Sequence, residues 1–210
     1  MIHTKQFFSK HMTANGHNLI IEGPVSPSDL AAMRFDEGLK AFRIPEEQHR
    51  ALVEIAELPE GRIIVAREDD LVLGYVTFLH PDPLERWSQA KLEDLLELGA
   101  IEVSAKVRAS SVGKEMIRVA FLDDVMEDYI VITTEYYWHW DLKGTGLDVW
   151  EYRKAMERLM MTVGMVWMAT DDPEICSHPA NCLMARIGKR VGQESILAFD
   201  GMRFQNRFLY

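Results

Sequence analysis

The sequence has only two cysteines, Cys176 and Cys182, among 210 residues. Two cysteines are too few for a fold held together by disulfides, so we expect a packed core in a reducing cytoplasm. No apolar run reaches the roughly 18 residues that a membrane-spanning helix needs. The N-terminal residues also lack the apolar stretch of a secretory signal. These absences predict a cytoplasmic protein without a membrane partner.

Positive charge is scarce as well. The chain has 33 acidic and 23 basic residues, which gives a formal net charge of -10. Because such a surface repels phosphate backbones, we expect no nucleic-acid partner. Acidic pairs stand at 93–94, 123–124 and 171–172. They are typical of solvated faces and loop ends, or they attract a cationic substrate such as a lysine-bearing protein.

Hydrophobic periodicity predicts an α+β (α/β) fold with a mixed central sheet flanked by helices. We expect a loose N-terminal arm over residues 1–17 and a single domain with a C-terminal extension over residues 18–210. The expected strands cover 18–22, 62–67, 71–79, 101–107, 129–134, 165–169 and 204–210. One helix is expected to start near Ser26, with Ser28 as its cap. Further helices are expected over 45–58, 88–98, 116–125, 148–162 and 179–189. The two runs in 62–79 indicate a hairpin, and the strand, helix, strand order over 101–134 favours parallel pairing.

The turn VRASSVGKEM, residues 107–116, joins an expected strand to an expected helix. Its Gly-Lys pair does not predict a nucleoside triphosphate site, because a Walker loop needs glycine where Arg108 stands and Ser or Thr where Glu115 stands. A helix N-terminus offers unpaired amides and a partial positive charge, which attract phosphate. The turn therefore fits a cradle for the pyrophosphate of coenzyme A, and an ordinary strand-to-helix turn is the alternative.

Residues 101–113 resemble a motif of the GNAT family of N-acetyltransferases, in which a strand leads into Arg/Gln-x-x-Gly-x-Gly/Ala and a helix. Arg108 takes the first place of the motif and Gly113 the last, whereas Ser111 and Ala109 stand where glycines are usual. Over nearly the whole chain, the sequence resembles the acetoin-utilisation acetyltransferases of this family. The segments that carry this resemblance are IEGPVSPSDL, EIAELPEGRIIVAR, PDPLERW, TTEYYWHWDLKGTGLDVWEYRKAMERLM and ATDDPEICSHPANCLMARIGK.

The resemblance implies the GNAT acyl-CoA N-acyltransferase fold with one extra strand-helix unit, and acetyl-CoA as the cosubstrate without a metal. It implies a cytoplasmic enzyme that acetylates a lysine of acetyl-CoA synthetase and so inactivates it, which regulates acetate and acetoin metabolism. The backbone amide of Val103 would polarise the thioester carbonyl. The cofactor-binding residues that it implies are Val103, Arg108, Ala109, Ser110, Ser111, Val112, Gly113 and Lys114.

Acetyl transfer to lysine requires a group that removes a proton from the ammonium. Glu102 is the first candidate, because it lies on the strand that would flank the thioester. A surface or salt-bridged glutamate is the alternative. Glu135 and His139 are further candidates in the aromatic stretch EYYWHWD, residues 135–141, whose rings could hold the lysine stem or only pack at a strand end.

Other residues and other functions stay open. Cys176, His178 and Cys182 supply three possible metal ligands without an obvious fourth. We therefore expect them to be ordinary residues of loops and helices that bind no metal. Asn181 and Gly188 resemble residues of a later helix in the family. A small-molecule amine acetyltransferase is one alternative function, and a non-catalytic, acetyl-CoA-sensing inhibitor of a partner enzyme is another.

Overall fold

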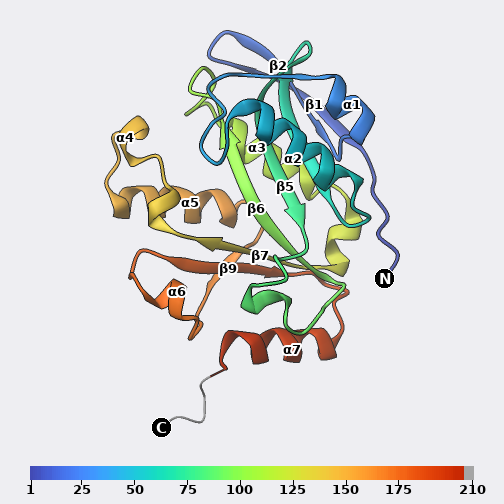
Figure 1. Cartoon of the computed structure of the whole chain (residues 1–210), viewed down its shortest axis with the longest axis vertical. Helices are drawn as coiled ribbons and strands as arrows, with labels where there is room; N and C mark the ends of the chain where they lie inside the picture. Colours follow the sequence, from blue (N-terminus) through green and yellow to red (C-terminus); the bar gives the residue numbers. More distant parts are fainter. Residues whose placement is uncertain (206–210) are drawn as a thin grey trace. The chain divides into compact units, whose positions relative to one another are not determined.

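The computed structural model describes residues 1–205, and their contacts form two compact units. The N-terminal unit comprises residues 2–79 and 98–126. The C-terminal unit comprises Met1 and residues 80–97 and 127–205. Strand β6 (Leu95–Val103) contributes residues to both units. The elements are labelled in Figure 1. The grouping of residues 18–210 into one domain stays a prediction.

The strands of the N-terminal unit run in the order β1-β2-β4-β5-β6. They are β1 (Phe8–Ala14), β2 (His17–Gly23), β4 (Arg62–Glu68) and β5 (Leu71–Leu79), with β3 (Arg34–Phe35) beside β5. Strands β1 and β2 pair antiparallel, as do β4 and β5. The expected hairpin over 62–79 is therefore confirmed, and β2 confirms the expected strand at 18–22.

Helices α1 (Pro27–Ala32), α2 (Pro45–Glu57) and α3 (Val112–Ala120) cover these strands, and α1 lies beside α2 (Figure 1). Leu52 of α2 packs with Ile63 and Tyr75 in one buried cluster. On the other face, a methyl group added at Gly74 would lie 3.2 Å from Met116 of α3. The helix cap is Ser26 rather than Ser28, because Pro27 takes the first helical position and the Ser26 hydroxyl accepts from the Asp29 amide.

In the C-terminal unit the strand order is β6-β7-β9-β8. The strands are β7 (Ile130–Glu135), β8 (Val166–Met168) and β9 (Cys182–Ile187), beside the first residues of β6. Strand β7 pairs parallel with β6, as the strand, helix, strand order predicts, and antiparallel with β9. Strand β8 pairs antiparallel with β9. Parallel and antiparallel pairs therefore occur in one sheet.

Helices and short turns complete the C-terminal unit. They are η1 (Arg86–Ser88), η2 (Asp124–Asp128, of which the last two residues belong here), η3 (Tyr137–His139), α4 (Leu142–Thr145), α5 (Val149–Met161), α6 (Pro173–Cys176) and α7 (Gln193–Arg203). Helix α5 begins with a capping box formed by Asp148 and Glu151, and it confirms the helix expected at 148–162. Trp87, Ile132, Leu183 and Phe199 pack together in the core. Among residues 1–205, no helix combines the length and the apolar character that crossing a membrane requires.

Two expected helices are wrong. Residues 88–98 do not form a helix, because β6 begins at Leu95 and its first three residues pair with β7. Within residues 179–189, Cys182–Ile187 form β9 instead of a helix, since this segment pairs with strands on both sides. Asn181 and Gly188 therefore flank a strand. In both segments, pairing with distant strands outweighs local helix propensity.

The expected strand at 101–107 is displaced and its faces are reversed. Strand β6 ends at Val103, and residues 105–111 form a turn. Glu102 is buried, whereas its apolar neighbours Ile101 and Val103 are half-buried. The buried side of β6 is therefore the side that carries Glu102, because Tyr75 and a loop amide supply hydrogen-bond donors there.

The expected loose arm is wrong for residues 8–14, which form β1 and pair with β2 along their length. The preceding residues are also bound, since the carbonyl of Thr4 accepts from Arg62 at 2.6 Å. Strand β1 is mostly polar, so its sequence carries little hydrophobic signal. At the other end, Phe204 and Gln205 are not in a strand, and the rest of the strand expected at 204–210 lies outside the described residues.

Candidate active site

The segment between β6 and α3 has the geometry of an anion cradle. Ala109 has φ 62° and Ser111 has φ 67°, both in the left-handed region. Left-handed residues within a turn can orient successive backbone amides toward one point. Ser111 precedes α3, and its own side chain makes no capping hydrogen bond to the first turn of that helix. The amides of Val112, Gly113 and Lys114 thus have no partner within the helix and can bind an anion.

Three predicted cofactor-binding residues shape this cradle. The hydroxyl of Ser110 donates to the carbonyl of Val107. The guanidinium of Arg108 donates to the carbonyl of Val103 at 3.3 and 3.4 Å, which holds a cation beside the end of β6. Gly113 has a helical conformation in the first turn of α3. Its value for a ligand is therefore the absence of a side chain, rather than a left-handed backbone.

Glu102 is 7% exposed, and both of its oxygens accept hydrogen bonds from the N-terminal unit. Oε1 accepts from the amide of Ala41 at 2.8 Å, and Oε2 accepts from the hydroxyl of Tyr75 at 2.7 Å. Burial raises the pKa of Tyr75, and the Glu102 carboxylate acts in the same direction. The phenol therefore stays protonated and remains a donor to Glu102.

A second buried carboxylate, Asp36, connects the loop 36–41 to the residues that follow β6. Asp36 accepts from the hydroxyl of Ser104 at 2.9 Å and from the amide of Gly38 at 3.0 Å, and it pairs with Lys106. Burial acts to raise the pKa of Asp36, but the hydrogen bonds from Lys106, Ser104 and Gly38 outweigh burial and hold this pKa below its usual value. The loop from 36 to 41 is thus fixed at both Asp36 and Ala41.

Glu135, at the end of β7, is a buried carboxyl with a shifted pKa. Its Oε2 accepts from the indole Nε1 of Trp140 at 3.0 Å. Burial raises the pKa of Glu135 to about 7, although hydrogen bonds from Trp140 and Thr133 act to lower it. A pKa near neutral pH is the value that suits a general base.

His139 and its aromatic neighbours lie directly after Glu135 in the turn η3. His139 is exposed, and its ring lies edge-on to those of Tyr136 and Trp138. Tyr136 and Trp138 stack on each other with their centroids 4.8 Å apart. Trp138 is still 46% exposed, so the stacked pair presents one large ring to solvent. The rings therefore pack on one another and also offer an exposed aromatic surface.

Glu97 is a further titratable residue of the candidate site, and no expectation from the sequence includes it. This residue of β6 accepts from the hydroxyl of Thr134 at 3.1 Å. Burial raises the pKa of Glu97 to about 7, and the carboxylate of Glu85 acts in the same direction. Glu97 was missed because its segment was expected to be helical. The alternation of Leu96, Glu97 and Leu98 is the signal that could have revealed a polar residue on the opposite side of a strand.

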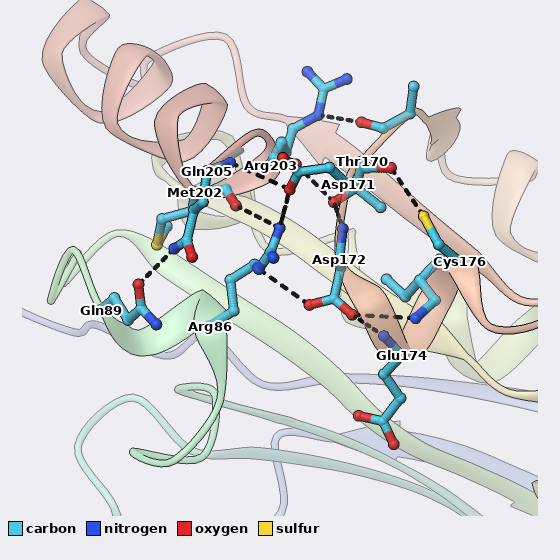
Figure 2. Close-up of polar contacts among 12 residues, drawn as sticks. Arg86, Gln89, Thr170, Asp171, Asp172, Glu174, Cys176, Met202, Arg203 and Gln205 are labelled. Carbon is cyan, nitrogen blue, oxygen red and sulfur yellow. Dashed lines mark hydrogen bonds and ion pairs between the residues drawn. The ribbon is translucent and has the colours of Figure 1, made fainter. Parts of the chain in front are cut away.

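The acidic pair Asp171–Asp172 does not form a solvated face. Figure 2 shows both carboxylates around Arg86 of η1, which pairs with Asp171 and, at 3.2 Å, with Asp172. Asp172 also accepts from the amides of Glu174 and Ile175 and so caps α6. This pair therefore fixes the loop before α6 in place.

Of the three residues considered as metal ligands, Cys176 and His178 contact other groups, and Cys182 is buried in a strand. The thiol of Cys176 donates to the carbonyl of Thr170 at 3.4 Å. The ring of His178 packs against Tyr137, with the centroids 4.2 Å apart, and Cys182 is buried in β9. Over residues 1–205, no three His, Cys, Asp or Glu side chains gather in a way that could hold a metal ion.

The chain is closely similar over nearly its full length to proteins of two bacteria. It is 60% identical over 210 residues, the full length of both chains, to the acetoin utilization protein AcuA of Bacillus subtilis (strain 168). The chain belongs to the AcuA family. A crystal structure of an acetoin utilization protein from Exiguobacterium sibiricum is 56% identical and matches with a TM-score of 0.96, covering 99% of this chain and 98% of that one. No protein-family model matches the chain.

More distant solved structures show the fold of the AcuA family. An acetyltransferase of the GNAT family from Streptococcus pneumoniae is 15% identical and matches with a TM-score of 0.52. The match covers 81% of this chain and 99% of that one. The chain therefore has the GNAT fold, with a mixed sheet flanked by helices, and the expected fold class is confirmed.

The predicted site residues of this AcuA-family chain fall into two groups. Glu102, Val103 and the cradle, residues 108–114, belong to the N-terminal unit. Glu135 and His139 belong to the C-terminal unit, together with Glu97. The first group supplies backbone amides, a guanidinium and the Glu102 carboxyl, and the second supplies the carboxyls of Glu97 and Glu135 and the imidazole of His139.

Proposed function

We propose that the chain is an acetyl-CoA-dependent protein lysine acetyltransferase that acetylates and inactivates acetyl-CoA synthetase in the cytoplasm. The observation that carries the proposal is the uncapped first turn of α3 behind the left-handed Ala109 and Ser111, in a chain of the AcuA family. The name of the relatives supports a role in acetoin metabolism.

In the proposed complex, the amides of residues 110–114 and the guanidinium of Arg108 bind the pyrophosphate of acetyl-CoA. The amide of Val103 donates to the thioester carbonyl, on which negative charge develops during attack. The neutral lysine nitrogen forms a bond to the carbonyl carbon, and the carbon–sulfur bond breaks. The products are the acetylated lysine and coenzyme A, whose thiolate takes up a proton.

Among the candidate bases we place Glu135 first. Its pKa of about 7 lies near neutral pH, where a general base is most effective. Glu102 ranks lower, because its hydrogen bonds from the Ala41 amide and the Tyr75 hydroxyl give it a role in holding the loop from 36 to 41. His139 is exposed and ranks between them, since its imidazole can also carry a proton.

Charge beside the aromatic pair supports a cationic acceptor. Burial raises the pKa of Tyr136, and the carboxylates of Glu174 and Asp172 act in the same direction. Negative charge therefore lies close to the Tyr136 ring. A lysine side chain suits such a place, because its stem can pack on a ring while its ammonium stays near the carboxylates.

The test combines the purified protein, acetyl-CoA and purified acetyl-CoA synthetase. We expect a mass increase of about 42 Da on one synthetase lysine, together with loss of synthetase activity. The matched control omits acetyl-CoA. Inhibition that persists in this control points to a non-catalytic inhibitor. High turnover of small amines without any change in the synthetase points to a small-molecule acetyltransferase, and either result overturns the proposal.

A further inference from the structure

The hairpin of β1 and β2 ends in a turn with the sequence Asn15-Gly16. Asn15 has φ 50° and Gly16 has φ 85°, so both residues are in the left-handed region. Two-residue hairpin turns favour this conformation, and asparagine and glycine tolerate it best. The backbone alone therefore explains why a residue such as asparagine or glycine stands at position 15. It does not explain where the Asn15 side chain is directed.

The side chain of Asn15 is bound to the loop that precedes the cradle. Its amide nitrogen lies 3.2 Å from the carbonyl oxygen of Lys106 and 3.2 Å from that of Arg108, and it donates to both. One carboxamide group has two hydrogens to donate, so a single side chain satisfies both carbonyls. These partners are 91 and 93 residues away in the sequence.

The two hydrogen bonds fix how the peptide groups of this loop are turned. In a planar trans peptide, the carbonyl and the N–H of the next residue point in opposite directions. Because the carbonyl of Arg108 points toward Asn15, the amide of Ala109 points away from Asn15. Ala109 is the first left-handed residue of the cradle, so Asn15 sets the orientation with which the cradle begins.

We propose that Asn15 is a positioning residue for the acetyl-CoA cradle, through its hydrogen bonds to the carbonyls of Lys106 and Arg108. This inference rests on the proposed function, because it assigns the cradle to the pyrophosphate of acetyl-CoA. Binding is tighter when a loop is already held in its bound conformation, since less ordering remains to be done on association. The N-terminal hairpin thus serves cofactor affinity without contacting the reacting atoms.

The main test variant is Asn15→Gly, which keeps the left-handed turn and removes the carboxamide. We expect the Kd for acetyl-CoA, measured by isothermal titration, to rise about five- to tenfold, with kcat within about twofold of wild type. The matched control is Asn18→Ala in the same hairpin, whose side chain accepts from the hydroxyl of Thr13 at 3.3 Å. This control should bind acetyl-CoA as the wild type does.

A second substrate separates positioning of the cradle from a general structural role. Acetylpantetheine has the thioester but no pyrophosphate, so Asn15→Gly should leave its kcat/KM unchanged. An equal loss for both substrates would overturn the inference, and so would an unchanged Kd for acetyl-CoA. If Asn15→Gly fails to fold, Asn15→Asp replaces it, because the carboxylate keeps the shape but cannot donate.

Asn15→Asp should weaken acetyl-CoA binding at least as strongly, since it sets a negative charge against two carbonyl oxygens. Failure of wild-type protein to bind acetyl-CoA would be a different result. That result would overturn the proposed function and, because the inference rests on it, this inference as well.

Discussion

Polar groups are held in different ways in the two units. In the N-terminal unit, the cradle offers backbone amides, and the nearby carboxylates Asp36 and Glu102 are occupied by donors of the same unit. In the C-terminal unit, burial raises the pKa of Glu97 and Glu135 to about 7. The first arrangement suits the binding of an anion with little reorganisation, and the second suits the movement of a proton. Substitutions in the two units should therefore change different kinetic constants.

Glu135→Gln should have the largest effect. We expect the acetylation rate to fall by roughly 100-fold near pH 8, because a general base typically contributes about 10²–10⁴. The Kd for acetyl-CoA should stay within about twofold of wild type. The active form of the base is the carboxylate, so the wild-type rate should be lost as the pH falls through about 7, the pKa of Glu135. The pH dependence of single-turnover acetylation measures this loss of rate. The Glu135→Gln variant should not show it.

A control variant and a stability measurement accompany Glu135→Gln. His139→Ala should lower the rate less than about threefold, because this exposed ring is the second candidate. Stability gives an independent readout. Since the folded pKa of Glu135 lies above its unfolded value of 4.5, wild-type stability should fall as the pH rises from about 4.5 to about 7. The glutamine variant should lack this part of the decrease. A large rate loss in His139→Ala alone would reverse the assignment.

Gly113→Val should have the next largest effect, and on binding. A branched side chain in the first turn of α3 would stand where the pyrophosphate must approach the amides. We expect the Kd for acetyl-CoA to rise roughly 10- to 30-fold, equivalent to about 1.4–2 kcal/mol. Isothermal titration measures this change. Gly201→Val is the matched control, because Gly201 lies in α7 with open space around it. Equal acetyl-CoA binding by both variants would remove the cradle assignment.

Glu102→Gln should have a moderate effect, of about five-fold in kcat/KM. Glutamine keeps one acceptor oxygen but sets an amide group against the second donor, Ala41 or Tyr75. The pH–rate profile should keep the shape of the wild-type profile, because Glu102 holds a loop in this interpretation. Tyr75→Phe removes one of the same hydrogen bonds and should act in the same direction. Loss of the limb near pH 7 in Glu102→Gln would instead make Glu102 the base.

Ser111→Gly should have the smallest effect and should be favourable. Serine in the left-handed region costs about 1 kcal/mol more than glycine. This strain is larger than the extra conformational entropy that glycine loses when the chain folds. We expect the free energy of unfolding to increase by about 0.5 kcal/mol, a rise in Tm of about 1–2 °C. Thermal denaturation with and without acetyl-CoA tests this, with Ser177→Gly as a control at a residue with φ -63°. A destabilised Ser111→Gly protein would show that the serine is not strained.

Much of the fold follows from local patterns. The hairpin at 62–79, the proline-led helix at 45 and the capped helix after Asp148 carry their signals within a few residues. The segments that became β6 and β9 could not be predicted in this way. Their leucines and charged residues favour a helix locally, and only distant partner strands make them extended.

The candidate site shows the same distinction between local signals and distant partners. The turn from Arg108 to Gly113 could be found because its signal is a contiguous strand-to-helix boundary. Asn15 could not, since its role depends on carbonyls more than 90 residues away in the sequence. The alternation around Glu97 is a weak signal, because the composition of its segment favours a helix and its partner Thr134 is distant in the sequence. The burial of Glu135 likewise depends on the packing of β7 and the position of Trp140, which no spacing rule gives.

The separation of binding from proton transfer is tested most directly by isothermal titration of acetyl-CoA into the wild-type, Gly113→Val and Glu135→Gln proteins, each also assayed for acetylation of the synthetase. We predict that Gly113→Val binds acetyl-CoA at least about tenfold more weakly, whereas Glu135→Gln binds it as tightly as wild type and transfers almost no acetyl group. Equal loss of acetyl-CoA binding in both variants would contradict the separation, and so would full acetylation by Glu135→Gln.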